Sequence, residues 1–260
     1  MNKSDIHLAG QLADAAGAAI RPYFRAEFGL ETKADASPVT QADRAAETAI
    51  RAILEAQCPL DGIIGEEYGA VRHSAARQWV IDPIDGTTSF IAGRPIFGTL
   101  IALCDGGWPV LGVIDQPILG ERWIGAAGNG ATLNGQPAKT RACPELSQAI
   151  LATTSPHCFS EHEAAHFLAL AAKTAHRRLI YGGDCYNYAL LASGYIDIVV
   201  ESGLKLHDFA ALVPVVEGAG GLMCDWRGEP LTADSAGDVI ALGDAARLDD
   251  VLEALNHSNC

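Results

Sequence analysis

Apolar residues recur at helical spacing in two stretches near the start of the chain. The first stripe spans residues 8–23 and the second spans residues 46–54, and a repeat of three to four residues is typical of an amphipathic helix. We therefore expect two opening helices, the second capped by Thr40. The segment between them, residues 29–38, is polar and aperiodic, which predicts a mobile surface loop carrying Lys33.

Short apolar runs separated by turn residues follow the second helix. They predict strands at residues 63–64, 79–81, 97–104, 110–114 and 122–124. The pairs Gly106-Gly107 and Asn134-Gly135 are typical of hairpin turns. Residues 1–145 are therefore expected to form an α+β half with a largely antiparallel sheet.

Strands and helices alternate after about residue 145. The pattern predicts strands at 149–153, 178–180, 196–201, 222–224 and 239–242, and helices at 161–176, 184–192, 209–218 and from 244 onwards. This order favours an α/β half over residues 146–260, with helices on both faces of its sheet. No linker separates the halves, so we expect one compact unit of mixed α/β class.

Composition and charge narrow the class of protein. The chain has 260 residues, 49% of them hydrophobic and 19% charged, which is typical of a globular protein. Its net charge of −14 would repel nucleic acid and anionic membranes. The seven cysteines are scattered, and no secretory or membrane-spanning segment is evident. We expect a cytoplasmic protein with reduced thiols that binds neither nucleic acid nor membrane.

The most informative stretch is Asp82-Pro83-Ile84-Asp85-Gly86-Thr87-Thr88. Because Pro83 has no N–H to donate, we expect the strand to end at Asp82 and the chain to leave the sheet. The carboxylates of Asp82 and Asp85 can then converge. They would repel one another without a cation between them, and hard oxygen ligands favour Mg²⁺ or Mn²⁺.

The residues after these acids suggest an anion site. Gly86 permits tight backbone geometry, and Thr87 and Thr88 can begin a helix whose free N–H groups would face a phosphate. Metal-assisted phosphoryl chemistry is the functional interpretation of the stretch. Its structural alternative is a turn in which an aspartate caps a helix.

Four further acids lie where they could join this site, and two of them have a structural alternative. Glu66 and Glu67 follow the predicted strand at 63–65, and Asp208 precedes the predicted helix at 209–218, where a simple N-cap is the alternative. Asp43 lies three residues after Thr40, which also fits a capping box. The eight histidines favour ordinary surface or core roles.

In combination, these residues resemble the inositol monophosphatase superfamily over nearly the whole chain. The resemblance rests on Val39-Thr40-x-x-Asp43, Gly65-Glu66-Glu67, residues 82–88, Asp208 and Glu217-x-Ala219-Gly220-Gly221. It implies an αβαβα layered sandwich and a homodimer. One position departs from the family, because His207 stands where a tryptophan is usual.

The resemblance also implies roles for individual residues. Glu66, Asp82 and the carbonyl of Ile84 would bind one Mg²⁺, and Asp82, Asp85 and Asp208 a second, while Glu66 would help to hold a third. Asp43 and Thr87 would orient and deprotonate the attacking water, with Glu66 as the third catalytic residue. The phosphate would contact Asp85, Gly86, Thr87 and Thr88.

Residues 181–194 are similar to the branch of this superfamily that hydrolyses histidinol phosphate. The amine and imidazole of histidinol phosphate can both be cationic, so they would pair with Asp184 and Glu201, and Gly183 would also contact the substrate. The structural alternative for Asp184 is a helix cap. Arg178 would reach substrate or an adjacent subunit, unless it is a solvated strand-end residue. We expect a histidinol-phosphatase of histidine biosynthesis that acts on a small phosphorylated metabolite.

Two alternatives stay open. The first is an inositol-1-phosphate phosphatase or a broad-specificity sugar phosphatase. The second is a non-catalytic regulatory protein that binds RNA or a transcription complex, against which the complete carboxylate set and the acidic charge weigh.

Overall fold

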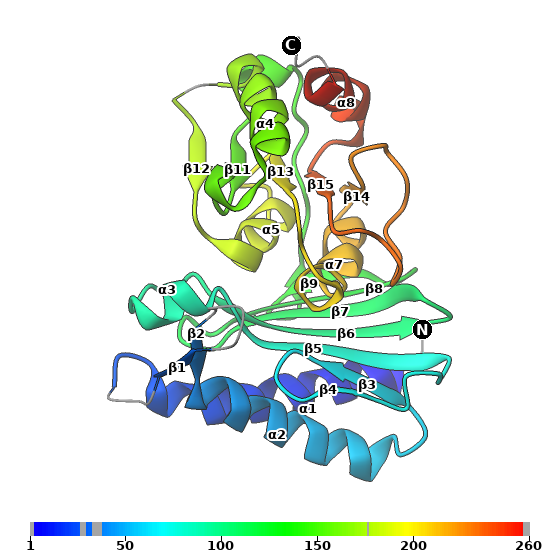
Figure 1. Ribbon diagram of the computed structural model, residues 1–260. Helices are drawn as coiled ribbons and strands as arrows, with labels where there is room; N and C mark the ends of the chain where they lie inside the picture. Colours follow the sequence, from blue (N-terminus) through cyan, green and yellow to red (C-terminus); the bar gives the residue numbers. More distant parts are fainter. Residues whose placement is uncertain (1–2, 27–29, 33–37, 176, 257–260) are drawn as a thin grey trace.

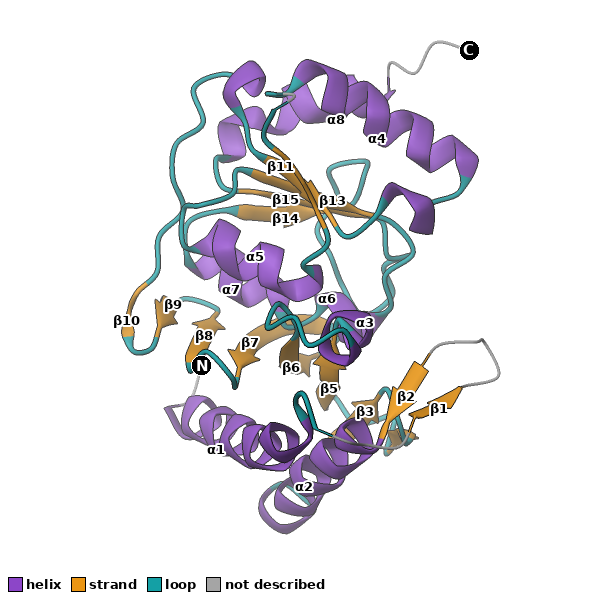
Figure 2. Ribbon diagram, turned by 90° about the vertical axis from the view of Figure 1, so that its left-hand side faces the viewer, coloured by secondary structure: helices purple, strands orange, loops and turns teal. Residues whose placement is uncertain are grey.

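Helical layers and two β-sheets alternate along one axis of the molecule (Figure 1). The structure is a computed structural model that describes residues 3–26, 30–32, 38–175 and 177–256. From one end to the other, the layers are α1 and α2, an eight-stranded sheet, α5 and α7, a five-stranded sheet, and α4 and α8 (Figures 1 and 2). The expected αβαβα sandwich is confirmed.

The first sheet belongs to the N-terminal half and packs on α1 (Lys3–Ile20) and α2 (Gln41–Gln57). Its strands are β3 (Gly62–Gly65), β4 (Gly69–Val71), β5 (Arg77–Asp85), β6 (Gly98–Asp105), β7 (Trp108–Gln116), β8 (Glu121–Ala126), β9 (Gly130–Leu133) and β10 (Gln136–Pro137). Their order is β10-β9-β8-β7-β6-β5-β3-β4. The neighbouring strands run antiparallel except for β3 and β5, which are parallel. The predicted antiparallel sheet is therefore present with one parallel pair, and both predicted hairpin turns join neighbouring strands.

The second sheet lies in the C-terminal half, between two helical layers. Its strands are β11 (Leu151–Thr153), β12 (Leu179–Tyr181), β13 (Ile198–Glu201), β14 (Leu222–Cys224) and β15 (Val239–Leu242), in the order β12-β11-β13-β15-β14. The helices are α4 (Glu161–Lys173) and α8 (Leu248–Asn256) on the outside, and α5 (Asp184–Ala192) and α7 (Leu212–Gly218) between the sheets. Single 3₁₀ turns occur at Arg21–Tyr23, Leu146–Gln148, Pro156–Cys158 and Ala245–Arg247.

Two glycines let α7 and the residue before it lie directly on the first sheet. Gly112 of β7 and Gly125 of β8 are cross-strand partners. A Cβ atom on Gly112 would overlap the carbonyl oxygen of Ala211, and one on Gly125 would overlap that of Pro214. The close approach of the two halves at this point depends on the absence of both Cβ atoms.

The strand that carries the acidic motif is longer than predicted. We expected the chain to leave the sheet after Asp82, but β5 continues to Asp85, which pairs with Gly98. The pairing register shifts between Asp82 and Asp85, because Pro83 has no N–H for the sheet ladder. The oxygen of Pro83 accepts a hydrogen bond from the Thr99 hydroxyl instead. The two acids thus flank a β-bulge rather than follow a strand end.

Two predicted helices have different bounds. The helix expected at 209–218 is divided into α6 (Leu206–Phe209) and α7, since Pro214 lacks the N–H that would continue one helix through this segment. The helix expected at 161–176 ends at Lys173, and residue 176 lies outside the described residues.

The segment expected as a loop at 29–38 contains two short strands. These are β1 (Leu30–Thr32) and β2 (Pro38–Thr40), and they pair antiparallel. Lys33 lies outside the described residues, as do the side chains that would test whether Thr40 caps α2. The six cysteines in the described ranges are all free thiols. No helix in these ranges has the length and hydrophobicity required to cross a membrane.

Candidate active site

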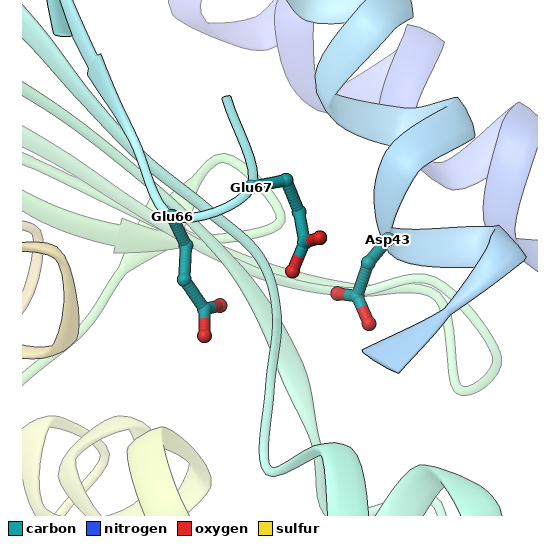
Figure 3. Close-up of side chains that lie close together, drawn as sticks. All are labelled: Asp43, Glu66 and Glu67. Atoms are coloured by element: carbon teal, nitrogen blue, oxygen red, sulfur yellow. The ribbon is translucent and has the colours of Figure 1, made fainter. Parts of the chain in front are cut away.

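Six carboxylates gather in two clusters where the N-terminal and C-terminal halves meet. One cluster contains Asp43, Glu66 and Glu67, and the other contains Asp82, Asp85 and Asp208. Within each cluster, one ligand oxygen per residue lies within 4.8 Å of the others. Figure 3 shows Asp43 at the start of α2, close to the carboxylate of Glu67. Glu66 directly precedes Glu67 in the chain. The structure therefore brings together the five acids predicted to bind metal or activate water, and Glu67, which was expected near the site without an assigned role.

Asp82 stands at the centre of the acidic clusters. Its side chain is 2% exposed, and one of its oxygens accepts a hydrogen bond of 3.1 Å from the amide of Ile84. Burial raises the pKa of Asp82 well above its usual range, and the negative charges of Glu66, Asp85, Asp208 and Asp43 raise it further. The charges of acids from both clusters thus act on Asp82, and the bridging role that the resemblance implies stays a prediction.

Asp85 links the two halves of the chain. Its Oδ2 accepts a 2.6 Å hydrogen bond from the backbone amide of Cys185, in the first turn of α5. Burial raises the pKa of Asp85 well above its usual range, as do the charges of Asp184 and Asp208. The bulge in β5 therefore places this carboxylate at the N-terminus of a helix from the other half.

Asp208 both caps a helix and belongs to the site. Its Oδ2 accepts a 2.7 Å hydrogen bond from the amide of Lys205 at the start of α6. The same carboxylate lies 3.5 Å from Nε2 of His207, the residue that departs from the family pattern. Burial raises the pKa of Asp208, although His207 opposes this effect. Asp208 therefore takes part in capping α6, while its role as a metal ligand stays a prediction.

Glu47 positions the loop that carries Glu66 and Glu67. It is completely buried on α2, and its oxygens accept hydrogen bonds from the amides of Glu67 (2.8 Å) and Tyr68 (3.2 Å). Arg51 neutralises it at 2.7 Å. Sequence reasoning missed this residue, although its position one helical turn after Asp43 on a buried face was an available signal.

The residues expected around the phosphate lie next to Asp85. Gly86 has a φ of +84° and precedes α3 (Thr87–Ile91), so the helix begins where the motif predicted. The hydroxyl of Thr87 donates a 3.1 Å hydrogen bond to the carbonyl of Ile84. Thr88 is exposed at the start of the same helix.

A cavity of about 270 Å³ lies beside the second acidic cluster. Its lining comprises Asp85, Thr154, Cys158, Asp184, Cys185, Tyr188, Glu201, Ser202, Gly203, Leu204, Asp208 and Leu212. The set contains Asp184 and Glu201, which were expected to contact substrate. Gly183 is buried beside the cavity as the residue before α5.

Backbone geometry directs Asp184 towards the phosphate motif. Asp184 has a φ of +44°, an unfavourable value for a residue with a side chain. A Cβ atom on Gly86 would lie 2.8 Å from Oδ2 of Asp184, so the two chain segments are in close contact. Strained backbone of this kind concentrates at functional sites.

Tyr188 is a cavity residue that sequence reasoning did not select. It is 2% exposed, and within the described part of the chain its hydroxyl has no hydrogen-bond partner. Since a buried hydroxyl without a partner is costly, the cavity presents a polar group that a ligand can satisfy. Its position in a predominantly apolar helix gave no distinct signal.

Arg178 does not join these residues within one chain. It lies at the start of β12, where its guanidinium donates a 3.3 Å hydrogen bond to the carbonyl of Gln148 and lines a separate hollow. Asp184 follows the opposite end of that strand. The expectation that Arg178 contacts substrate within its own subunit has no support in this geometry.

The family model for the inositol monophosphatase family matches residues 1–258. The chain belongs to the inositol monophosphatase family. It is therefore a phosphatase of this family by descent, in agreement with the resemblance of its acidic motifs.

Three relatives illustrate the range of the inositol monophosphatase family around this chain. A bifunctional phosphatase, the chloroplastic IMPL2 of Arabidopsis thaliana, is 51% identical over 94% of this chain and 72% of its own length. A histidinol-phosphatase of Chlorobaculum parvum is 40% identical over 91% of this chain and 92% of its own. The solved structure of an inositol monophosphatase from Zymomonas mobilis is 53% identical, with a TM-score of 0.89 over 97% and 98% of the two chains.

The acidic clusters fit the metal ions that this family uses. Their ligand atoms are carboxylate oxygens, which suit hard divalent cations rather than thiophilic metals. Asp82, Asp85 and Asp208 all have raised pKa values, because burial and mutual repulsion disfavour three negative charges in one place. A bound divalent cation would offset both costs.

A pH-dependent stability effect is expected at Glu201, which is 4% exposed. Burial raises its pKa to about 7, in spite of hydrogen bonds from the Thr154 amide and the Thr153 hydroxyl. The folded protein therefore holds this proton more tightly than the unfolded chain. As the pH rises from about 4.5 to 7, Glu201 ionises in the unfolded chain while the folded protein keeps its proton. This difference should lower the free energy of unfolding by up to about 3 kcal/mol, and the loss persists at higher pH.

Glu201→Gln should remove this effect, since glutamine keeps the acceptor oxygen but does not ionise. In urea unfolding with chelator present, the variant should match the wild type at pH 4.5 and be more stable by up to about 3 kcal/mol at pH 8. An equal difference at both pH values would contradict the assignment.

Proposed function

We propose that this phosphatase is Mg²⁺-dependent and hydrolyses histidinol phosphate. The observation that carries the substrate assignment is the pair of acids, Asp184 and Glu201, in the cavity beside the second acidic cluster. Histidinol phosphate has an amine and an imidazole that can be cationic, whereas inositol is neutral. A cationic group would favour the ionised form of the buried Glu201, whose pKa is about 7.

The geometry supports a division of labour among the residues. Bound Mg²⁺ would neutralise phosphoryl oxygens and acidify the attacking water. Asp82, Asp85, Asp208, Glu66 and the carbonyl of Ile84 would hold these ions. Asp43, buried beside Glu66 and Glu67, would accept a proton from the water. Thr87, Thr88 and Gly86 would position the phosphate at the start of α3, and Thr87 would help to orient the water.

The remaining cavity residues would bind the leaving group. Asp184 and Glu201 would pair with its cationic groups, and the unpartnered hydroxyl of Tyr188 would hydrogen-bond to it. These residues line the same cavity as Asp85 and Asp208, and their contacts with the leaving group would select among phosphate esters.

The substrate assignment predicts a specificity ratio. Phosphate release should be measured from L-histidinol phosphate and from inositol 1-phosphate, with Mg²⁺ and with chelator, and with Asp82→Asn as the blank. We expect kcat/KM to favour histidinol phosphate by about a hundredfold or more, which corresponds to about 2.7 kcal/mol of differential transition-state binding.

Matched tyrosine variants test which residues set this ratio. Tyr188→Phe should lower the ratio by about tenfold, since it removes one hydrogen bond to the leaving group. Tyr186→Phe is the control, because the Tyr186 hydroxyl bonds to Glu121 at 2.6 Å and does not line the cavity. Equal ratios in wild type and Tyr188→Phe would remove Tyr188 from substrate recognition.

A second candidate is an inositol monophosphatase, as the similar Zymomonas mobilis protein is described. A ratio near one, or one that favours inositol 1-phosphate, would support this candidate or a broad-specificity phosphatase. If neither ester is hydrolysed in a metal-dependent way, a regulatory protein becomes the better interpretation.

We also propose a cytoplasmic homodimer. The edge strand β12 presents Ile180 and Tyr181, which are 36% and 50% exposed, and Leu168 on α4 is 54% exposed. An exposed apolar sheet edge is a surface that a second copy can cover. Arg178 at the start of β12 would then lie near the neighbouring subunit, and a monomeric mass by light scattering would contradict this proposal.

A further inference from the structure

The outer helix α4 brings two histidine side chains together. Nε2 of His162 and Nε2 of His166 lie 3.1 Å apart, and their ring centroids are separated by 4.3 Å. The residues are four apart and therefore share one face of the helix. With Glu163 they form the spacing His-Glu-x-x-His, in which a helix presents two imidazoles to one metal ion. The expectation of ordinary roles for the histidines overlooked this spacing.

The other ring nitrogen of His166 determines which tautomer is present. Nδ1 of His166 contacts the carbonyl oxygen of Leu255 on α8. A carbonyl can only accept, so Nδ1 donates to it, and Nε2, which lies 3.1 Å from Nε2 of His162, is the ring nitrogen that a metal ion would bind. Metal-binding histidines are typically held in this way, by a hydrogen bond from the second ring nitrogen to a carbonyl or carboxylate. The Trp226 ring, with its centroid 6.5 Å away, packs beside His166.

The separation of the two Nε2 atoms is close to that of two ligands on one ion. Tetrahedral Zn²⁺ with Zn–N bonds of about 2.0–2.1 Å places two nitrogen ligands about 3.3 Å apart. His162 is exposed and His166 half-buried, so a small rotation of His162 accommodates the difference. Water can supply the remaining ligands on the exposed side.

Glu163 does not act as the base that this spacing supplies in metalloproteases. Its Oε2 accepts a 2.7 Å hydrogen bond from the Ser160 amide, and the Ser160 hydroxyl accepts one from the Glu163 amide. Hydrogen bonds from Ser160 and Ser202 lower the pKa of Glu163. The carboxylate is thus engaged in capping α4, and the two histidines are left as the metal-binding groups of the motif.

We propose that His162 and His166 form a Zn²⁺ site on α4, distinct from the acidic clusters. The donor types separate the two kinds of site, because imidazole suits Zn²⁺ and carboxylate oxygens suit Mg²⁺. Their positions separate them too, since α4 lies on the outer side of the five-stranded sheet (Figure 1). The bound ion would hold the His162 ring against His166, which is itself joined to α8 through Leu255.

Calorimetric titration of the untagged protein with Zn²⁺, in excess Mg²⁺ that occupies the carboxylates, tests this proposal. The comparison is between wild type, His162→Ala and the control His73→Ala, which removes another exposed histidine. Loss of a residue that only orients a metal ligand weakens metal binding about tenfold to a hundredfold. His162 is proposed as a ligand itself, so its loss should weaken Zn²⁺ binding at least about tenfold. His73→Ala should bind Zn²⁺ as the wild type does.

Two further measurements keep the result interpretable. Zn²⁺ should raise the melting temperature of the wild type in excess Mg²⁺, and should do so less in His162→Ala. The Mg²⁺-dependent phosphatase activity of His162→Ala should equal that of wild type, which shows that the variant is folded. Equal Zn²⁺ affinity in wild type and His162→Ala, or no Zn²⁺ binding by wild type in excess Mg²⁺, would overturn the proposal.

Discussion

Replacing Asp82 by asparagine should lower kcat/KM for any phosphate ester that the protein hydrolyses by about 10³-fold or more. Asp82 belongs to the second acidic cluster, and the charges of Glu66 and Asp43 from the first cluster also act on it. Metal ions contribute several kcal/mol of charge stabilisation in such reactions, and each 1.36 kcal/mol corresponds to a factor of ten. The amide of asparagine keeps the acceptor for the Ile84 N–H but lacks the negative charge.

The same substitution should make the metal-free protein more stable. Asp82 is buried among negative charges that no cation offsets in the metal-free protein. Removal of its charge therefore relieves electrostatic repulsion. Activity assays, together with thermal unfolding in chelator, separate this outcome from simple misfolding. Asp105→Asn, at the exposed end of β6, is the matched control and should change neither property. Retention of metal-dependent turnover by Asp82→Asn would exclude the proposed site.

Replacing Gly112 by alanine should lower the free energy of unfolding by about 4 kcal/mol or more. The new methyl group would overlap the main-chain oxygen of Ala211, and backbone between two packed layers cannot move aside as a flexible side chain can. For a protein of this size, the melting temperature should fall by at least about 8 °C. Because Ala211 closely follows Asp208, the displacement should also weaken any metal binding at Asp208.

Gly10→Ala is the matched control for this prediction. Gly10 lies within α1, and an added Cβ has no heavy atom within 4 Å. Alanine should stabilise that helix by about 0.5–1 kcal/mol, so the two glycine substitutions should have opposite signs. Similar melting temperatures for Gly112→Ala and wild type would show that α7 can move away from the sheet without cost.

The fold was largely predictable because its elements have strong local periodicity. The apolar stripes of α1 and α2 and the β-α alternation after residue 145 predicted the correct element types. Two of the errors arose where one residue interrupts a pattern. Pro83 produces a bulge inside β5 rather than an end, and Pro214 separates α6 from α7. Whether a proline ends, bends or divides an element depends on tertiary packing, which the spacing of apolar residues does not predict.

The acidic site was predictable because its residues occur in specific short motifs. Asp82 and Asp85 were selected from their spacing. Glu66, Asp43 and Asp208 were noted from their positions and received roles from the family resemblance. Glu47, Tyr188 and the His162–His166 pair were missed for different reasons. Glu47 and Tyr188 act through burial and through hydrogen bonds to distant segments, which only the folded chain reveals. The histidine spacing was visible in the sequence and was overlooked.

The contribution of Asp208 from the C-terminal half has a consequence for the order in which the site forms. A chain that is still being synthesised exposes Asp43, Glu66, Glu67, Asp82 and Asp85 well before Asp208 leaves the ribosome. These five carboxylates then lack the sixth, and Asp85 also lacks the amide of Cys185 until α5 forms. We therefore expect the cluster of Asp82, Asp85 and Asp208 to bind a cation only after the two halves have docked, whereas the cluster of Asp43, Glu66 and Glu67 needs no residue from the C-terminal half.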